Sequence, residues 1–303
     1  MDNILKTLLY EWKERTLPEL IPRSRPLKLQ NFTDNNSVIV TGFRRVGKTY
    51  LLFDAIQELL KTYTREEVVY INFEDERVIP NIDLLTNLIP EIQKTYRKKP
   101  LYLFLDELQI IPSWSKWVRR ILDTEKIKLY ITGSSSKMSS FELPTELRGR
   151  SWEFPVLPLS FNEFLRFKAE LLDFEKIKFD LNEQARFSYL FEEYLIFGGL
   201  PAVVLTEKEN KQELLQSYFQ TVIQKEIGER FHLQNESALK ILLKLLINSN
   251  YITISKLTNS LKSLGISMGK STVDNYISYI ESSYFMKELY IFSPSVVNQL
   301  QYP

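Results

Sequence analysis

The chain has 303 residues, long enough for about two domains, and its 44% share of apolar residues is sufficient for a sizeable buried core. Its formal net charge of +1 excludes capture of nucleic acid by the field of the whole molecule, so such a partner would require a local basic patch. With no cysteine and a single histidine, His232, the sequence excludes disulfides, iron–sulfur clusters and histidine-rich zinc sites, and leaves a hard cation on oxygen ligands as the expected metal.

The N-terminal segment predicts an amphipathic helix, because Leu5, Leu8, Leu9 and Trp12 recur at helical spacing. The stretch IPRSRP after it is typical of an extended linker. Neither this segment nor any later apolar run approaches the roughly 20 residues that cross a bilayer. We therefore predict a soluble, cytoplasmic protein without a membrane partner.

Five β-type runs then alternate with helical patterns, which predicts a parallel α/β sheet. The first and third runs are almost continuously apolar, as expected of strands that are buried on both faces. The five runs are SVIVTG (37–42), EVVYINFED (67–75), PLYLFLDE (100–107), KIKLYITGS (126–134) and WEFPVLPLS (152–160).

Helical patterns dominate the rest of the chain. Long amphipathic segments after the sheet predict a helical lid, and from Ser237 a series of helices, a tight turn and a terminal hairpin predict a winged helix-turn-helix. The predicted division is an N-terminal helix and linker (1–36), a P-loop core (37–160), a helical lid (161–236) and the winged helix-turn-helix (237–303).

The stretch TGFRRVGKT, between the first strand and the next helix, matches the phosphate-loop pattern GxxxxGK[ST] in the context that the motif requires. Its glycines let backbone N–H groups converge on a phosphate, Lys48 would neutralise the β and γ oxygens, and the Thr49 hydroxyl would ligate Mg²⁺. We expect the side chains of Arg44 and Arg45 to face outward. The residues predicted to surround the nucleotide are Gly42, Phe43, Arg44, Arg45, Val46, Gly47, Lys48, Thr49 and Tyr50.

The run LYLFLDE places Asp106 at the end of a buried strand, where a carboxylate without a cation would be costly to desolvate. A bound Mg²⁺ would compensate that cost, so we predict Asp106 as the Walker B aspartate and, with Thr49, as a metal ligand. The adjacent Glu107 is then the predicted catalytic base that polarises the attacking water. Asp75 and Glu76 are the alternative bases.

The run EVVYINFED lies between the phosphate loop and Asp106 in the sequence, which favours the division of P-loop proteins that has an additional strand at this point. A GTPase is not favoured, because no NKxD-type guanine signature is present. The polar end of KLYITGSSSKM would lie between the two motifs, and there we predict Ser134 as the sensor of the γ-phosphate, with Ser135 as the alternative.

Two further segments contain candidate residues for catalysis and for binding the adenine. In ELRGR, Arg150 is the predicted arginine finger and Arg148 its alternative, and we expect this segment near the sensor end of the sheet. In FGGLP, Pro201 would lie on the adenine, although a helix-ending Gly-Pro turn explains the same residues.

These motifs, in this order and spacing, resemble the archaeal ATPase group of the AAA+ class, which is related to the origin-recognition and STAND ATPases. The resemblance runs from about residue 37 to residue 292 and rests on TGFRRVGKT, YINFED, LFLDE, YITGSSSKM, LRGRSWEFPVLPLSFNEFL, YLIFGGLPAVV and YFQTVIQKEI. It implies ATP binding and hydrolysis, a helical lid and a winged helix. Members of this group usually continue into a further C-terminal domain, so we expect a shortened form here.

Two functions are compatible with these features. The first is an AAA+ type ATPase that hydrolyses ATP to ADP with Mg²⁺, works as a homo-oligomer and acts on double-stranded DNA. The second is a STAND-like switch whose winged helix clamps the nucleotide and binds no DNA. The recognition helix would offer Lys270, Ser271, Thr272, Asn275 and Tyr276 to DNA.

Overall fold

The computed structural model describes residues 2–27, 36–133, 145–233, 235–249, 253–289 and 292–295. The chain divides into two compact units, Met1–Lys211 and Gln212–Pro303. The finer division into four segments stays a prediction.

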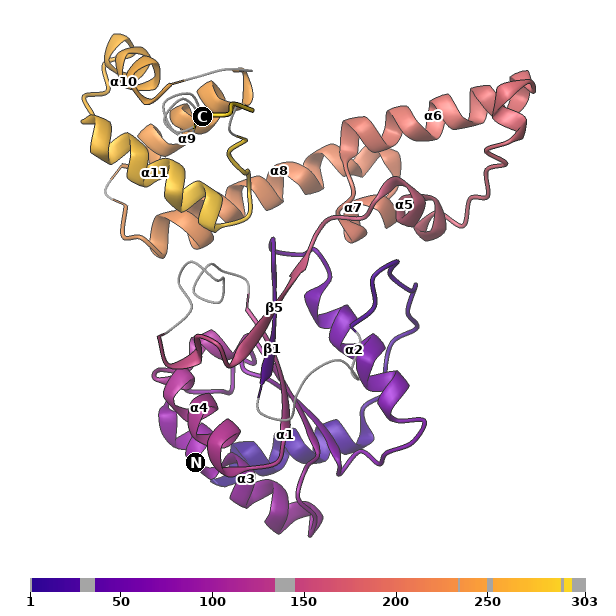
Figure 1. Ribbon diagram of the computed structural model, residues 1–303, viewed down its shortest axis with the longest axis vertical. Coiled ribbons are helices and arrows are strands. Elements are labelled where there is room, and N and C mark those ends of the chain that lie inside the picture. Colours follow the sequence, from indigo (N-terminus) through magenta and orange to yellow (C-terminus); the bar gives the residue numbers. More distant parts are fainter. Residues whose placement is uncertain are drawn as a thin grey trace. The chain divides into compact units, whose positions relative to one another are not determined.

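The first unit contains the predicted parallel sheet (Figure 1). Its strand order is β2-β3-β4-β1-β5, and every neighbouring pair is parallel. The fourth strand therefore lies in space between the strand that leads to the phosphate loop and the strand that ends at Asp106. The strands are β1 (Ser37–Gly42), β2 (Val68–Asn72), β3 (Tyr102–Asp106), β4 (Lys128–Thr132) and β5 (Ser151–Val156).

Helices flank the sheet, with α2 and α4 on opposite sides of it (Figure 1). The predicted N-terminal helix is present as α1, and it packs against α3 and β2, where the Trp12 indole N–H donates to the carbonyl oxygen of Val68 at 2.9 Å. The apolar faces of these helices and both faces of the sheet form one core. The elements are α1 (Asp2–Glu14), α2 (Lys48–Leu59), α3 (Ile82–Tyr96), η1 (Leu108–Ile110), α4 (Trp114–Thr124) and η3 (Thr145–Leu147).

After β5 the chain forms several helices, in the region predicted as a helical lid. Its core contains Phe164, Leu165 and Leu190, with the Phe161 ring stacked on Phe164 at a centroid distance of 5.9 Å. A capping box of Ser160 and Glu163 begins α5. The elements are α5 (Phe161–Phe167), η4 (Lys176–Lys178), α6 (Leu181–Phe197), α7 (Pro201–Leu205), η5 (Lys208–Asn210) and α8 (Lys211–Thr221), the last of which continues into the second unit.

Helices are the only regular secondary structure among the described residues of the second unit. It contains the π-helix η6 (Val222–Glu229) and the helices α9 (Glu236–Ile247), α10 (Ile254–Ser263) and α11 (Lys270–Ser282). Three helices follow one another as a helix-turn-helix requires, but the described part of the predicted hairpin, 284–289, forms no strand. Tyr251 and Ile252 of the predicted short strand lie outside the described residues. Tyr276 is 7% exposed in the core of this unit, so its prediction as a DNA contact is wrong.

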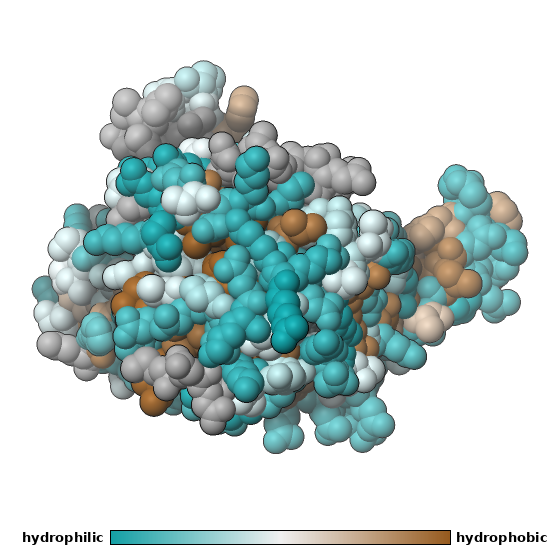
Figure 2. All heavy atoms as spheres, turned by 90° about the horizontal axis from the view of Figure 1, so that it is seen from below, coloured by the Kyte–Doolittle hydropathy of each residue, from teal (hydrophilic) through white to brown (hydrophobic). Residues whose placement is uncertain are grey.

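The surface agrees with the amphipathic patterns of the helices. The face seen in Figure 2 is dominated by hydrophilic side chains, with apolar ones scattered among them. Within the described residues, no helix is both long enough and apolar enough to cross a membrane.

Candidate nucleotide-binding site

The predicted phosphate loop joins β1 to α2 and has the backbone that its sequence requires. The Lys48 ammonium is buried and donates to the carbonyl oxygens of Gly42 at 3.0 Å and Phe43 at 3.1 Å. Gly47, which precedes α2, has a φ of 100°. The loop thus holds the lysine against its own backbone at the N-terminus of a helix, which is the geometry of an anion site.

The two motif glycines are needed for different reasons. A Cβ on Gly42 would lie 2.4 Å from the carbonyl oxygen of Val156, because β1 and β5 pair directly at these two residues. A Cβ on Gly47 would have room, but the positive φ of this residue disfavours an L side chain. The close packing of β5 therefore requires glycine at position 42, and the positive φ favours glycine at position 47.

Asp106 ends β3 with 2% of its surface exposed, and three hydroxyl groups surround its carboxylate. The hydroxyls of Thr49 and Tyr70 each donate to Oδ2 at 2.8 Å, and the Thr132 hydroxyl donates to Oδ1. Burial, and next the charge of Asp106, raise the pKa of Tyr70, so this phenol stays protonated as a donor. The structure therefore brings the two predicted metal ligands, Thr49 and Asp106, into contact.

The donor set at Asp106 fits a hard cation. It consists of a carboxylate and hydroxyl oxygens, which are the ligands that Mg²⁺ prefers. In the described part of the chain, no three acidic or histidine side chains converge to hold a metal ion by themselves. An ion here would need ligands from elsewhere, and the phosphate oxygens of a nucleotide in the loop are suited to supply them.

Glu107 follows Asp106 in a left-handed conformation with a φ of 55°, which is uncommon for a residue with a side chain. Its backbone N–H donates to Thr132 Oγ1 at 3.0 Å, and its carboxylate accepts from the Gln109 amide. Burial raises the pKa of Glu107, with Asp106 adding to this effect, while Lys48 and Gln109 oppose it. The predicted base thus lies beside both motifs, in an environment that makes its carboxylate more basic.

The sensor stays a prediction, but a threonine at the end of the same strand contacts both catalytic acids. Ser134, Ser135 and Ser136 lie outside the described residues, whereas Thr132 is fully buried at the end of β4 and contacts both Asp106 and Glu107. The strand order explains this contact, because β4 is the neighbour of both β1 and β3. Thr132 belongs to the polar end of KLYITGSSSKM. In the parallel pairing of β1 and β4 it lies opposite Val40, near the end of β1 that leads to the phosphate loop.

Arg150 does not lie near the sensor end of the sheet, contrary to the sequence-based expectation. Its carbonyl oxygen accepts from the Ser37 N–H at 2.9 Å, and its guanidinium pairs with Asp123. Ser37 begins β1, and the phosphate loop follows the opposite end of that strand. The reason is the parallel pairing of β1 and β5, in which Ser37 aligns with Ser151 and Gly42 with Val156.

The remaining predicted contacts surround the loop. A Cβ on Gly47 would lie 3.7 Å from Pro201 Cγ, so the lid proline is near the phosphate loop. Arg44 pairs with Glu74 at 3.3 Å on the surface. Tyr50 is 58% exposed on the first turn of α2. Arg45 is also exposed, Phe43 is partly buried, and Val46 is fully buried.

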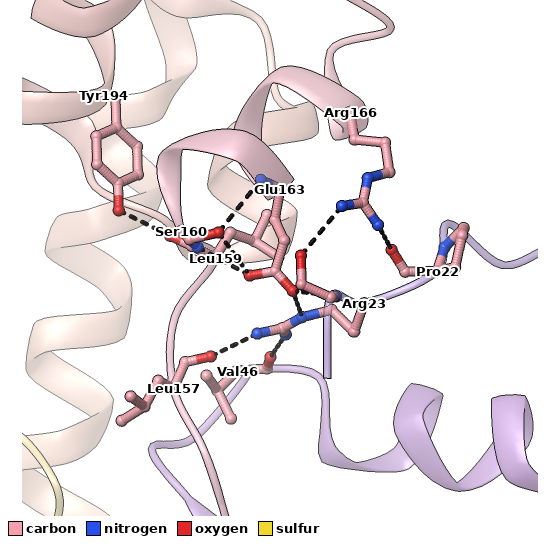
Figure 3. A network of polar contacts seen from close by, with 10 residues as sticks. Pro22, Arg23, Val46, Leu157, Leu159, Ser160, Glu163, Arg166 and Tyr194 are labelled. Atoms are coloured by element: carbon pink, nitrogen blue, oxygen red, sulfur yellow. Dashed lines mark hydrogen bonds and ion pairs between the residues drawn. The ribbon is translucent and has the colours of Figure 1, made fainter. Parts of the chain in front are cut away.

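Two residues near the loop were missed by the sequence-based prediction. Tyr70 belongs to the apolar pattern of β2, and no feature of that pattern distinguishes its hydroxyl. Arg23 comes from the linker IPRSRP and donates to the carbonyl oxygen of Val46 at 3.2 Å (Figure 3). Its proline-rich context predicted the extended conformation but not a contact with the phosphate loop.

Comparison with known families agrees with this geometry. Residues 34–165 match a family model described as an AAA domain. Residues 188–301 match a second model, described as a domain of unknown function.

Similar proteins are found in archaea and bacteria. An uncharacterized protein of Methanocaldococcus jannaschii, MJ1544, is 36% identical over 263 residues, which cover 86% of this chain and 57% of the relative. An uncharacterized protein of Haemophilus influenzae is 28% identical over 266 residues, which cover 85% of this chain and 63% of the relative. The chain thus spans less than two thirds of the length of these curated relatives.

Among solved structures, C. elegans PCH-2 is similar with a TM-score of 0.38 and 12% identity, over 74% of this chain and 67% of that chain. AMPPCP-bound DnaA from Aquifex aeolicus is similar with a TM-score of 0.34 and 15% identity, over 92% of this chain and 88% of that chain. Both similarities are distant. Residues 34–165 thus match an AAA domain, and the parallel sheet with β4 between β1 and β3 and the phosphate loop agree with that match.

Proposed function

We propose that the protein binds ATP with Mg²⁺ and hydrolyses it to ADP to drive or gate a conformational change. The observation that carries this proposal is the hydrogen bond of 2.8 Å between Thr49 of the phosphate loop and the buried carboxylate of Asp106. It joins the two groups that would hold Mg²⁺. When bound there, the ion would neutralise charge on the β and γ phosphate oxygens.

The other residues of the site have separate roles in this proposal. Lys48 supplies a positive charge for the phosphates, and the N-terminus of α2 adds backbone N–H donors. Glu107 accepts a proton from the attacking water, for which its raised pKa suits it. Thr132 holds Asp106 and the backbone of Glu107 in place from the neighbouring strand.

The test of this function is calorimetric titration with Mg-ATP, together with a phosphate-release assay. Lys48→Ala removes the charge that faces the phosphates, so we expect it to abolish measurable ATP binding and turnover. Lys61→Ala is a matched control, because the Lys61 side chain forms an exposed ion pair with Glu58. If Lys48→Ala binds ATP as tightly as the wild type, this loop is not the nucleotide site.

For the finer assignment, we propose the archaeal ATPase group of the AAA+ class and double-stranded DNA as the partner of the second unit. Support comes from the first turns of α11, where the polar side chains Lys270, Ser271, Thr272 and Asn275 are all exposed. A helix with this composition can contact phosphates and base edges. The alternative is a STAND-like switch whose second unit responds to nucleotide and binds no DNA.

Duplex binding across a salt series, with and without a non-hydrolysable ATP analogue, distinguishes the two. DNA binding predicts an affinity that falls steeply with salt, because phosphate contacts release counterions. It also predicts that Lys270→Ala weakens binding, whereas Lys225→Ala, at an exposed lysine of η6, leaves it unchanged. An affinity that does not change with salt concentration, or no binding at all, would favour the STAND-like switch.

A further inference from the structure

Arg23 connects three parts of the first unit through its guanidinium group (Figure 3). Nη1 donates to the carbonyl oxygen of Val46 in the phosphate loop at 3.2 Å, and Nη2 donates to that of Leu157 after β5 at 2.7 Å. Nε donates to the Glu163 carboxylate on α5 at 2.9 Å. The side chains of Arg23 and Glu163 are only 15% and 7% exposed. Such a planar group with several directed donors is suited to fix three acceptors at once.

The contact with Val46 determines the direction of a phosphate-binding group. In a planar trans peptide, the C=O and N–H bonds point in opposite directions. The carbonyl of Val46 and the N–H of Gly47 belong to one such peptide. Because the Val46 carbonyl accepts from Arg23, the N–H of Gly47 points away from Arg23, and it is one of the loop N–H groups that would face a bound phosphate. A charged donor on the carbonyl also polarises the N–H and strengthens it as a donor.

Glu163 keeps Arg23 in this position. Its carboxylate accepts from the backbone N–H groups of Ser160 and Ser24 at 2.9 and 2.8 Å, in addition to the bond with Arg23. Burial raises the pKa of Glu163, but these hydrogen bonds and the charge of Arg23 outweigh it and lower the pKa to about 2. The carboxylate is therefore ionised at neutral pH and holds the guanidinium in a single orientation.

We propose that Arg23 is a positioning residue for phosphate binding, which orients the N–H of Gly47 through the carbonyl of Val46 and ties this peptide to Glu163 of the lid. The inference deepens the proposed function and rests on it. It differs from a role in recognising the base, because the group that Arg23 orients faces the phosphates. It differs from a general role in docking the linker, because a second arginine docks the same linker without touching the phosphate loop.

That second arginine is Arg166, which provides the matched control. It lies on α5, as Glu163 does, and donates to the carbonyl oxygen of Pro22 at 2.7 Å and to Ser24 Oγ at 3.0 Å. Figure 3 shows both arginines on the same stretch of linker, with only Arg23 reaching Val46. Replacing either residue by alanine removes an arginine between linker and lid, but only Arg23→Ala frees the Val46 carbonyl.

The experiment measures the affinity for ATP and for inorganic tripolyphosphate, each with Mg²⁺, by competition against a fluorescent ATP analogue. Tripolyphosphate has the phosphates of ATP but no base. We expect Arg23→Ala to weaken both ligands by about tenfold or more, the effect that corresponds to one charge-assisted hydrogen bond. We expect Arg166→Ala to change each affinity less than about twofold, because the exposed Arg166 does not contact the phosphate loop.

Three results would overturn the proposal. They are affinities of Arg23→Ala that match the wild type, a loss for ATP without a loss for tripolyphosphate, and an equal loss in Arg166→Ala. If Arg23→Ala does not fold, Arg23→Lys replaces it, since a lysine can pair with Glu163 but lacks the fork that reaches the two carbonyls; wild-type affinities in that variant count against the proposal. The proposed function fails separately, if the wild type binds ATP no better than Lys48→Ala does.

Discussion

At the scale of single residues, the Asp106 carboxylate organises the site. Its contacts come from the phosphate loop (Thr49), from β2 (Tyr70) and from β4 (Thr132), so three separate segments meet at one acid. A buried carboxylate is costly unless its oxygens are hydrogen-bonded or bind a cation. The three hydroxyls satisfy this need, and they also leave the carboxylate oxygens able to accept a metal ion in exchange.

Glu107→Gln tests the catalytic base. The amide keeps the shape of the carboxylate but cannot take a proton from water, so we expect turnover to fall about 10²- to 10⁴-fold with ATP affinity nearly unchanged. Phosphate release and calorimetric titration measure the two effects. Glu58→Gln is the control, because Glu58 forms an exposed ion pair with Lys61. Turnover at the wild-type rate in Glu107→Gln would direct attention to Asp75 or Glu76.

Thr132→Val tests which residue at the end of β4 is the sensor. The substitution replaces the hydroxyl by a methyl group and removes the partner of both Asp106 Oδ1 and the Glu107 N–H. We expect turnover to fall by about 10- to 100-fold while ATP still binds, since the change disturbs groups that face the γ-phosphate. Ser134→Ala is the companion variant. The opposite outcome, in which only Ser134→Ala loses activity, would confirm the sequence-based prediction.

At the scale of elements, the N-terminus of α5 joins the lid to the sheet. Ser160 and Glu163 form a capping box that satisfies the first N–H groups of the helix, and the same glutamate binds Arg23. A hydrogen bond of 2.7 Å from the Leu159 N–H to the Gly199 carbonyl holds the turn between α6 and α7 against this segment. A Cβ on Gly199 would lie 2.2 Å from the Leu159 carbonyl oxygen, so only glycine permits this approach.

The variant Glu163→Gln tests whether the charge of Glu163 stabilises this junction, through the pH dependence of the free energy of unfolding. The folded protein lowers the pKa of Glu163 from 4.5 to about 2, so the ionised carboxylate stabilises the folded state above about pH 4.5, and this contribution is lost as the pH falls toward about 2. We expect the variant to be less stable by about 1–3 kcal/mol near neutral pH. The difference from the wild type should shrink as the pH falls below about 4.5.

Denaturant unfolding of both proteins at a series of pH values measures this difference. Glu175→Gln is the control, because Glu175 forms an exposed ion pair with Lys178 that contributes little to stability. A difference for Glu163→Gln that is independent of pH would show that the charge of Glu163 does not stabilise the junction.

At the scale of the whole molecule, local patterns predicted the elements, and pairing between distant segments determined the site. Apolar runs located the five strands, and the phosphate-loop motif located the lysine and threonine of the site. The position of the end of β4 between the two motifs was predicted from the sequence, but the contact of Thr132 with Asp106 was not, because several polar residues follow one another there. The bond between Arg23 and Glu163 joins residues 140 positions apart, so no local signal predicts it.

The position of Arg150 leads to a prediction about assembly. Six residues of β5 separate it from the end of the sheet that bears the phosphate loop, a distance of about 20 Å at the usual rise of a strand. It therefore cannot reach a γ-phosphate in its own copy of the chain. As an arginine finger it would have to act on a neighbouring copy, where such a group accelerates phosphoryl transfer by about 10³- to 10⁵-fold.

Mixing two inactive variants tests this arrangement. Arg150→Ala should lose hydrolysis and keep ATP binding, whereas Lys48→Ala should lose both. A mixture of the two should recover activity, because one copy contributes the intact pocket and the other contributes the arginine. Asp123→Ala is the control, since it removes the partner of Arg150 but keeps the guanidinium. Specific activity of the wild type should also rise with protein concentration, as assembly brings Arg150 to the neighbouring pocket. No recovery in the mixture, together with turnover that is independent of concentration, would mean that each copy works alone and that Arg150 only pairs with Asp123.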